Sequence, residues 1–180
     1  MRIYKLLSSL LEYPDQELID HIPELREFVS EDADISDLER TNLLQFLNYL
    51  EQANLISLQS EYVETFDMKP ENSLHLTHHL FGDDKNRGPA LIDLGELYKD
   101  YGVEISTNEL PDYLPLVLEF TAYLEDSEST VFLSDAKKVF EVLNGNLEKS
   151  GSPYASLTAI IENRASLTRL AFKGGNDELA

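Results

Sequence analysis

Cysteine is absent from this 180-residue chain, and only 14 lysine and arginine residues stand against 34 aspartate and glutamate residues. The lack of cysteine excludes a disulfide framework, a thiolate nucleophile and a zinc finger. Long apolar runs are also missing, and none approaches the roughly 20 residues of a membrane-spanning helix. The amino-terminal stretch has spaced rather than continuous apolar residues, so we expect no signal peptide and a cytoplasmic protein.

The shortage of basic residues gives a formal net charge of −20. That charge opposes binding to nucleic acid or to an anionic membrane and favours a positively charged partner, although solubility alone is a sufficient reason for acidity. Lysine and arginine are missing between Arg40 and Lys69 and again between Lys99 and Lys137. If these two acidic regions face each other, they form a groove suited to a basic peptide.

Apolar residues recur at the spacing of amphipathic helices, and alternating strand patterns are essentially missing. The pattern predicts an all-α fold, an irregular single-domain bundle of about eight helices over residues 1–173, followed by a disordered tail at 174–180. Residues 71–88 are left without an assignment. The expected helices cover 3–11, 15–29 with a break at Pro23, 36–50, 53–66, 90–101, 111–125, 130–147 and 153–170.

Sequence motifs of catalysis are missing, including the phosphate-binding loop and the nucleophile elbow. On a helix, His75 and His79 would share one face and resemble half of a metal site, but the position after His75 is Leu76 and not the glutamate of the zincin motif. A structural or partner-contacting histidine pair is the simpler interpretation. We therefore expect a binding protein without cofactor or metal, and a metal-dependent enzyme using these histidines remains the alternative.

Five stretches carry a more specific signal: 10–15, 62–67, 73–83, 86–94 and 109–120. In this order they resemble the molybdenum cofactor assembly chaperones of respiratory nitrate reductase, the nitrate reductase delta subunit family, over roughly residues 3–125. Three positions depart from the family pattern, and at one of them Phe81 stands where a second histidine commonly follows. His78 stands where an acid often precedes the histidine matched by His79, and Tyr113 stands where a wider group often has histidine.

The resemblance implies an all-helical protein that is not an enzyme and not part of the finished reductase. Its expected partner is the apo catalytic subunit, bound through that subunit's basic amino-terminal peptide. The chaperone would support molybdenum cofactor insertion and delay membrane docking until insertion is complete. A chaperone of another molybdoenzyme, such as a sulfoxide or N-oxide reductase, is the alternative.

The expected peptide site combines the two acidic regions. Tyr62, Phe66, Leu110 and Leu114 would take the apolar face of a helical peptide. Acidic residues beside them would receive its basic side chains and improve orientation and association rate. The full expected set is Tyr62, Glu64, Phe66, Asp67, His75, His79, Arg87, Glu109, Leu110, Asp112, Leu114 and Pro115.

Overall fold

A computed structural model describes residues 2–106 and 108–174 of the protein, with side chains described as far as Ser166. Within these residues it contains eleven α-helices and two short turns of other helix types, which confirms the all-α prediction. The expected tail at 174–180 lies outside the described residues, apart from Gly174, the last residue of the final helix.

The helices follow one another with short connections. They are α1 (Arg2–Leu11), α2 (Gln16–Asp20), α3 (Ile22–Glu31), α4 (Asp37–Gln52), α5 (Leu55–Tyr62), the π-helical turn η1 (Val63–Asp67), the 3₁₀ turn η2 (Pro70–Asn72), α6 (Leu76–Phe81), α7 (Arg87–Asp100), α8 (Leu114–Tyr123), α9 (Asp126–Asp135), α10 (Lys137–Lys149) and α11 (Ala155–Gly174).

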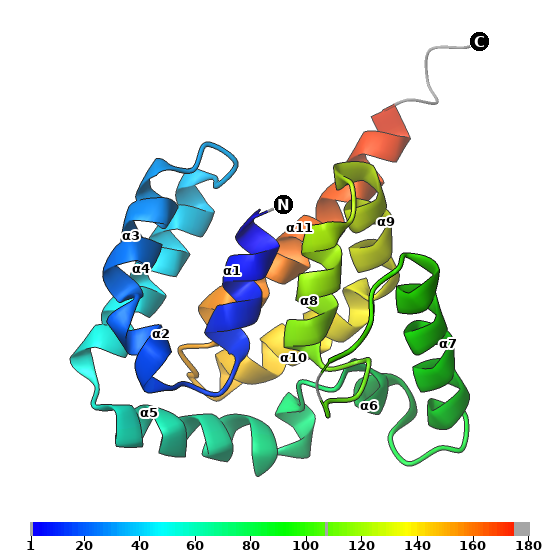
Figure 1. The fold of residues 1–180 in the computed structure, drawn as a ribbon, viewed down its shortest axis with the longest axis horizontal. Coiled ribbons are helices and arrows are strands. Elements are labelled where there is room, and N and C mark those ends of the chain that lie inside the picture. The colour runs from blue at the N-terminus through cyan, green and yellow to red at the C-terminus, as the bar shows by residue number, and fades with distance from the viewer. Residues whose placement is uncertain (1, 107, 175–180) are drawn as a thin grey trace.

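Helices α1 and α8 lie side by side at the centre of the fold, although they are far apart in the sequence (Figure 1). The α3–α4 hairpin forms one edge of the molecule and α7 forms the opposite edge, while α5 runs across the bottom of the view. Helix α11 packs against α4, α9 and α10 and connects the two sides. The main core lies between α1, α4, α8, α10 and α11.

Local sequence signals explain the first half of the chain. The apolar stripe of α1 is buried, and the helix ends before Pro14. Asp15 caps α2 by accepting a hydrogen bond from the Leu18 amide at 2.8 Å. Ser36 and Glu39 form the expected capping box at the start of α4. The break expected near Pro23 is confirmed, because α2 and α3 meet at His21 and proline stands in the first turn of α3.

Three expected helix boundaries were wrong. The helix expected at 130–147 is two helices, α9 and α10, separated at Ala136. The helix expected at 111–125 begins only at Leu114, because the residues before it pair with another segment. The helix expected at 53–66 ends as an α-helix at Tyr62 and continues as the wider turn η1, in which the Met68 amide donates to the Val63 carbonyl at 3.0 Å.

Two apolar clusters stabilise this arrangement. The larger contains α1, α4, α8, α10 and α11 and includes fully buried leucines from each of them. The smaller joins α7 to α8 through Tyr98, Phe120 and Leu124. Helix α7 thus packs on the fold mainly through aromatic and leucine side chains of a separate, smaller cluster.

Candidate functional site

A short antiparallel pairing joins the segments that precede α6 and α8. The Leu76 amide donates to the Asp112 carbonyl at 3.0 Å, and the Leu114 amide donates to the Leu74 carbonyl at 2.8 Å. His75 and Tyr113 therefore face each other, with their ring centroids 5.4 Å apart. The pairing thus brings the histidine-rich stretch 75–79 into direct contact with the proline-containing stretch 111–115.

Asp112 is the buried centre of this region, with none of its surface exposed. One carboxylate oxygen lies 3.2 Å from Nδ1 of His75, and the other accepts hydrogen bonds from the amide and hydroxyl of Thr77, at 2.9 and 2.6 Å. Burial alone would raise the pKa of the Asp112 carboxyl, but hydrogen bonds from His75 and Thr77 outweigh it and leave this pKa below its usual range. Asp112 is thus held as a carboxylate inside the protein.

Two side chains of α7 help to hold the segment around Asp112, one through Thr77 of α6 and one directly. Nε of Arg87 donates to the Thr77 hydroxyl at 3.0 Å, and this hydroxyl in turn donates to Asp112. The Tyr98 hydroxyl donates to the Pro111 carbonyl at 2.7 Å. The backbone at 111–113 is thereby held in place by side chains from α6 and α7.

Tyr113 connects this network to α1. Its hydroxyl lies 3.1 Å from that of Tyr62, which donates to the Leu11 carbonyl at 2.9 Å. Since a tyrosine hydroxyl has one proton, Tyr113 is the donor to Tyr62. Tyr13 packs edge-on against the Tyr62 ring, with centroids 5.5 Å apart, and remains 49% exposed. The end of α1, the end of α5 and the start of α8 meet at these rings.

Several carboxylates act electrostatically on Tyr113 and on Glu12. Burial raises the pKa of Tyr113, and the charges of Glu109, Glu12 and Asp67 raise it further. Burial and the like charges of Glu119, Asp15 and Glu109 raise the pKa of Glu12. These five carboxylates, brought from four parts of the chain, are called the acidic cluster below: Glu12, Asp15, Asp67, Glu109 and Glu119.

Three members of the acidic cluster are followed directly in the sequence by an exposed apolar side chain. Tyr13 follows Glu12, Met68 follows Asp67 and Leu110 follows Glu109. These side chains are 49%, 70% and 41% exposed. The surface around Tyr113 therefore offers both negative charge and apolar contact area.

The residues expected at a peptide site fall into three groups. Tyr62, Phe66, Asp112, Leu114 and Pro115 are buried, so they support the surface in this conformation and do not form the walls of an open groove. The partly buried residues are His75, His79 and Arg87. Those on the surface are Glu64, Asp67, Glu109 and Leu110.

The charges of Asp67 and Glu109 both act on Tyr113 and raise its pKa. His75 and His79 have separate partners: His75 contacts Asp112, and Nε2 of His79 donates to the Ser73 carbonyl at 2.7 Å. The two histidines therefore bind different groups of the protein and do not contact a common partner. In the described part of the chain, no three histidine, aspartate or glutamate side chains are grouped so as to hold a metal ion.

Sequence reasoning did not nominate Glu12, Tyr13, Thr77 or Glu119. Glu12 and Tyr13 lie in the family-like stretch 10–15, and that stretch was the available signal. Thr77 and Glu119 also lie in family-like stretches, 73–83 and 109–120, but their roles depend on the approach of Asp112 and of the end of α1, which the sequence does not show. No helix among the described residues is long and apolar enough to cross a membrane.

Comparison with family models matches residues 15–159 to the nitrate reductase delta subunit family. The nitrate reductase molybdenum cofactor assembly chaperone NarJ of Escherichia coli K12 is 35% identical over 152 residues, which are 84% of this chain and 64% of that protein. This chain therefore spans less than two thirds of that relative's length. The probable NarJ of Bacillus subtilis is 33% identical over 159 residues, covering 88% of this chain and 85% of the relative.

Among solved structures, a putative redox enzyme maturation protein from Archaeoglobus fulgidus has a similar fold. Its TM-score is 0.64 with 23% identity, and the match covers 89% of this chain and 90% of that one. At this level of identity the likeness concerns the fold alone.

Proposed function

The chain belongs to the nitrate reductase delta subunit family, and from this premise we propose that it is an assembly chaperone of a molybdenum-containing nitrate reductase. It acts in the cytoplasm without catalysing a reaction. Its client is the apo catalytic subunit, which it keeps competent for molybdenum cofactor insertion before the subunit docks at the membrane. The binding element on the client is a basic amino-terminal peptide.

The observation that supports peptide binding most directly is the acidic cluster around Tyr113. Burial and the negative charges of Glu119, Asp15 and Glu109 together raise the pKa of Glu12. Holding like charges together costs folding free energy, and a cation placed among them removes that cost. A bound peptide with lysine or arginine side chains supplies such cations.

The exposed side chains of Tyr13, Met68 and Leu110 provide the apolar half of the site. An amphipathic helical peptide laid on this surface contacts them with its apolar face while its basic residues meet the carboxylates. The network of Asp112, Thr77 and Arg87 holds the segment before α8 in place and so fixes where Glu109 and Leu110 are presented.

The test is isothermal calorimetry with a synthetic peptide carrying the first residues of the cognate catalytic subunit. We expect micromolar or tighter binding at low salt, weakening as salt is added because the carboxylates are exposed. Asp67→Lys should weaken binding about tenfold, which corresponds to about 1.4 kcal/mol.

Glu27→Lys is the matched control, because Glu27 is an exposed acid on α3, at the opposite edge of the fold from α7. It makes the same charge change and should leave the dissociation constant within about twofold of the parent value. Absence of binding by the parent protein at low salt contradicts the proposal. A peptide from a sulfoxide or N-oxide reductase that binds more tightly would instead assign the chain to another molybdoenzyme.

A further inference from the structure

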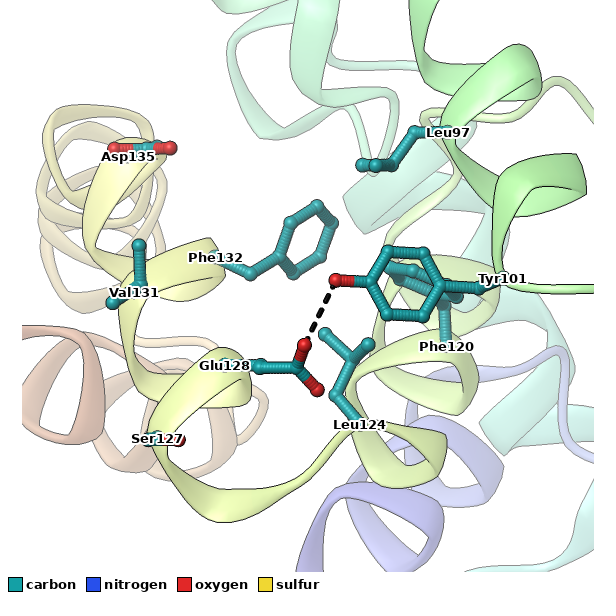
Figure 2. Close-up of a pocket in the computed structure, with 9 residues that line it drawn as sticks. All are labelled: Leu97, Tyr101, Phe120, Leu124, Ser127, Glu128, Val131, Phe132 and Asp135. Atoms are coloured by element: carbon teal, nitrogen blue, oxygen red, sulfur yellow. Dashed lines mark hydrogen bonds between the residues drawn. The ribbon is translucent and has the colours of Figure 1, made fainter.

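A second surface, lined by no member of the acidic cluster, is hollowed between α7, α8 and α9. The pocket there has a volume of about 410 Å³. Figure 2 shows Leu97 of α7, Tyr101 directly after α7 and Phe132 of α9 among its lining residues. Most of the wall is apolar. The complete lining is Leu97, Tyr101, Phe120, Leu124, Ser127, Glu128, Val131, Phe132 and Asp135.

Aromatic packing gives the floor of this pocket a defined shape. The Phe120 ring contacts Tyr101 and Phe132 edge-on, with centroids 5.4 and 5.2 Å apart, and contacts buried Tyr98 at 4.5 Å. Three helices thus converge on one ring. The pocket is therefore bounded by rings that are already in contact with one another and need little rearrangement to receive a ligand.

A hydrogen bond joins two side chains that line the pocket. The Tyr101 hydroxyl, directly after α7, donates to Glu128 Oε1 of α9 at 3.0 Å, as the dashed line in Figure 2 marks. Tyr101 is 37% exposed and Val131, on the α9 wall, is 46% exposed. Apolar area at the mouth is thus open to solvent and available to a partner.

The charge around the pocket selects the partner. Glu128 and Asp135 line it, and the whole stretch between Lys99 and Lys137 contains no lysine or arginine. A second copy of this chain, with its net charge of −20, is repelled from such a surface, and so is a phosphate-rich ligand. Apolar walls with acids at the rim match a helix whose apolar face is flanked by basic side chains.

We propose that the α7–α8–α9 pocket is a second docking site, which takes an amphipathic basic helix presented by a partner polypeptide. Apolar side chains on one face of that helix enter between Leu97, Val131 and Phe132. Its lysine or arginine side chains pair with Glu128 and Asp135, and Glu128 exchanges its bond from Tyr101 for one from the partner. This site does not depend on peptide binding at the acidic cluster.

The composition of the chain allows a direct test. The protein has no tryptophan, so a synthetic helical peptide of leucine and lysine with one tryptophan is the sole source of tryptophan emission. We expect this probe to bind with a blue shift. In an Asp67→Lys background, which weakens binding at the acidic cluster, Val131→Arg should weaken binding of the probe about tenfold or more, and a leucine–glutamate peptide should not bind.

Val142→Arg is the matched control, since Val142 is a 53% exposed valine on α10 that does not line the pocket. It should bind the probe within about twofold of the parent protein. Circular dichroism of both variants checks that they are folded. Equal binding by Val131→Arg and Val142→Arg overturns the proposal.

Cross-linking places the probe independently. Because the chain has no cysteine, Ser127→Cys creates a single thiol at the pocket and Ser30→Cys creates one on α3. A bromoacetyl form of the probe should alkylate the thiol of Ser127→Cys much faster than the thiol of Ser30→Cys. The same difference should be seen when Asp67→Lys is added to both variants to weaken the acidic cluster. Equal alkylation rates would show that the probe does not dock at the pocket and would overturn the proposal. A dimer in sedimentation that Val131→Arg dissociates would show a second copy of the chain as the occupant and would overturn it as well.

Discussion

Asp112 and Thr77 are 35 positions apart in the chain, yet the Asp112 carboxylate accepts two hydrogen bonds from Thr77, at 2.9 Å from its amide and 2.6 Å from its hydroxyl. This pair joins the start of α6 to the segment that precedes α8. Arg87 reaches the same hydroxyl from α7. A residue that the sequence placed among the peptide ligands thus has a structural role in the interior, and its effect on the surface is indirect.

Asp112→Ala should destabilise the protein by about 3 kcal/mol or more, because it leaves two buried donors of Thr77 without an acceptor. Urea denaturation followed by circular dichroism measures the effect. Asp93→Ala, an exposed acid on α7, is the control and should change stability by no more than about 0.5 kcal/mol. Similar losses in both variants would contradict the structural role of Asp112.

His79 should make the protein less stable in mild acid. Burial lowers the pKa of this histidine, and the bond to the Ser73 carbonyl only partly opposes the shift. As pH falls below about 6.5, the unfolded chain takes up the proton first, so stability is lost between that value and the lower folded pKa. Urea denaturation from pH 8 to pH 5 should show this slope, and His79→Gln should flatten it. An unchanged slope in the variant would rule out His79 as its source.

Arg164→Ala should cost about 3 kcal/mol of folding stability. Arg164 makes a two-pronged contact with Glu39 at 2.6 and 3.0 Å, and the two side chains are only 10% and 12% exposed. Arg26→Ala removes a similar contact with Glu51, but those side chains are 33% and 45% exposed. That variant should lose less than about 1 kcal/mol. Thermal unfolding of the two variants gives the comparison, and equal losses would argue against the Glu39 pair.

Glu12→Gln should separate stability from binding. Burial and nearby Glu119, Asp15 and Glu109 raise the pKa of Glu12, so its charged form opposes folding as pH rises above the usual glutamate pKa. At neutral pH and low salt the variant should be slightly more stable than the parent, by less than about 0.5 kcal/mol. It should also bind the client peptide several-fold more weakly. Denaturation and calorimetry on one preparation measure both, and a variant that binds as tightly as the parent would remove Glu12 from the site.

Helix positions were largely predictable because they depend on local signals. The stripe of α1, the cap at Asp15 and the capping box at Ser36 each involve residues within about one or two helical turns. The break between α9 and α10 was missed, since the apolar pattern continues through Ala136 without a glycine or proline to mark it. The π-helical turn η1 was missed for a similar reason, because the stretch 63–67 reads as ordinary helix.

The candidate site was only partly predictable. Charge and spacing indicated the two acidic regions, and Asp67 from one and Glu109 from the other both act electrostatically on Tyr113. Their part in peptide binding stays a prediction. Exposure was not predictable: Tyr62, Phe66 and Leu114 have the composition of an apolar groove, and their burial follows from packing against other helices. Such packing depends on partners distant in the sequence, which a local pattern does not identify.

The sequence by itself determined the helical fold, the strong acidity and the family resemblance, because these follow from local periodicity, composition and short ordered motifs. Only the tertiary structure decided which acids act together and which side chains face solvent. In the folded protein Asp112 is buried in contact with His75, and the charges of Glu12, Asp67 and Glu109 all act on Tyr113. A pocket lies beside Phe120. The physical reason is that burial and electrostatic coupling depend on distances between residues, and those distances are set when α1, α6, α7 and α8 pack together.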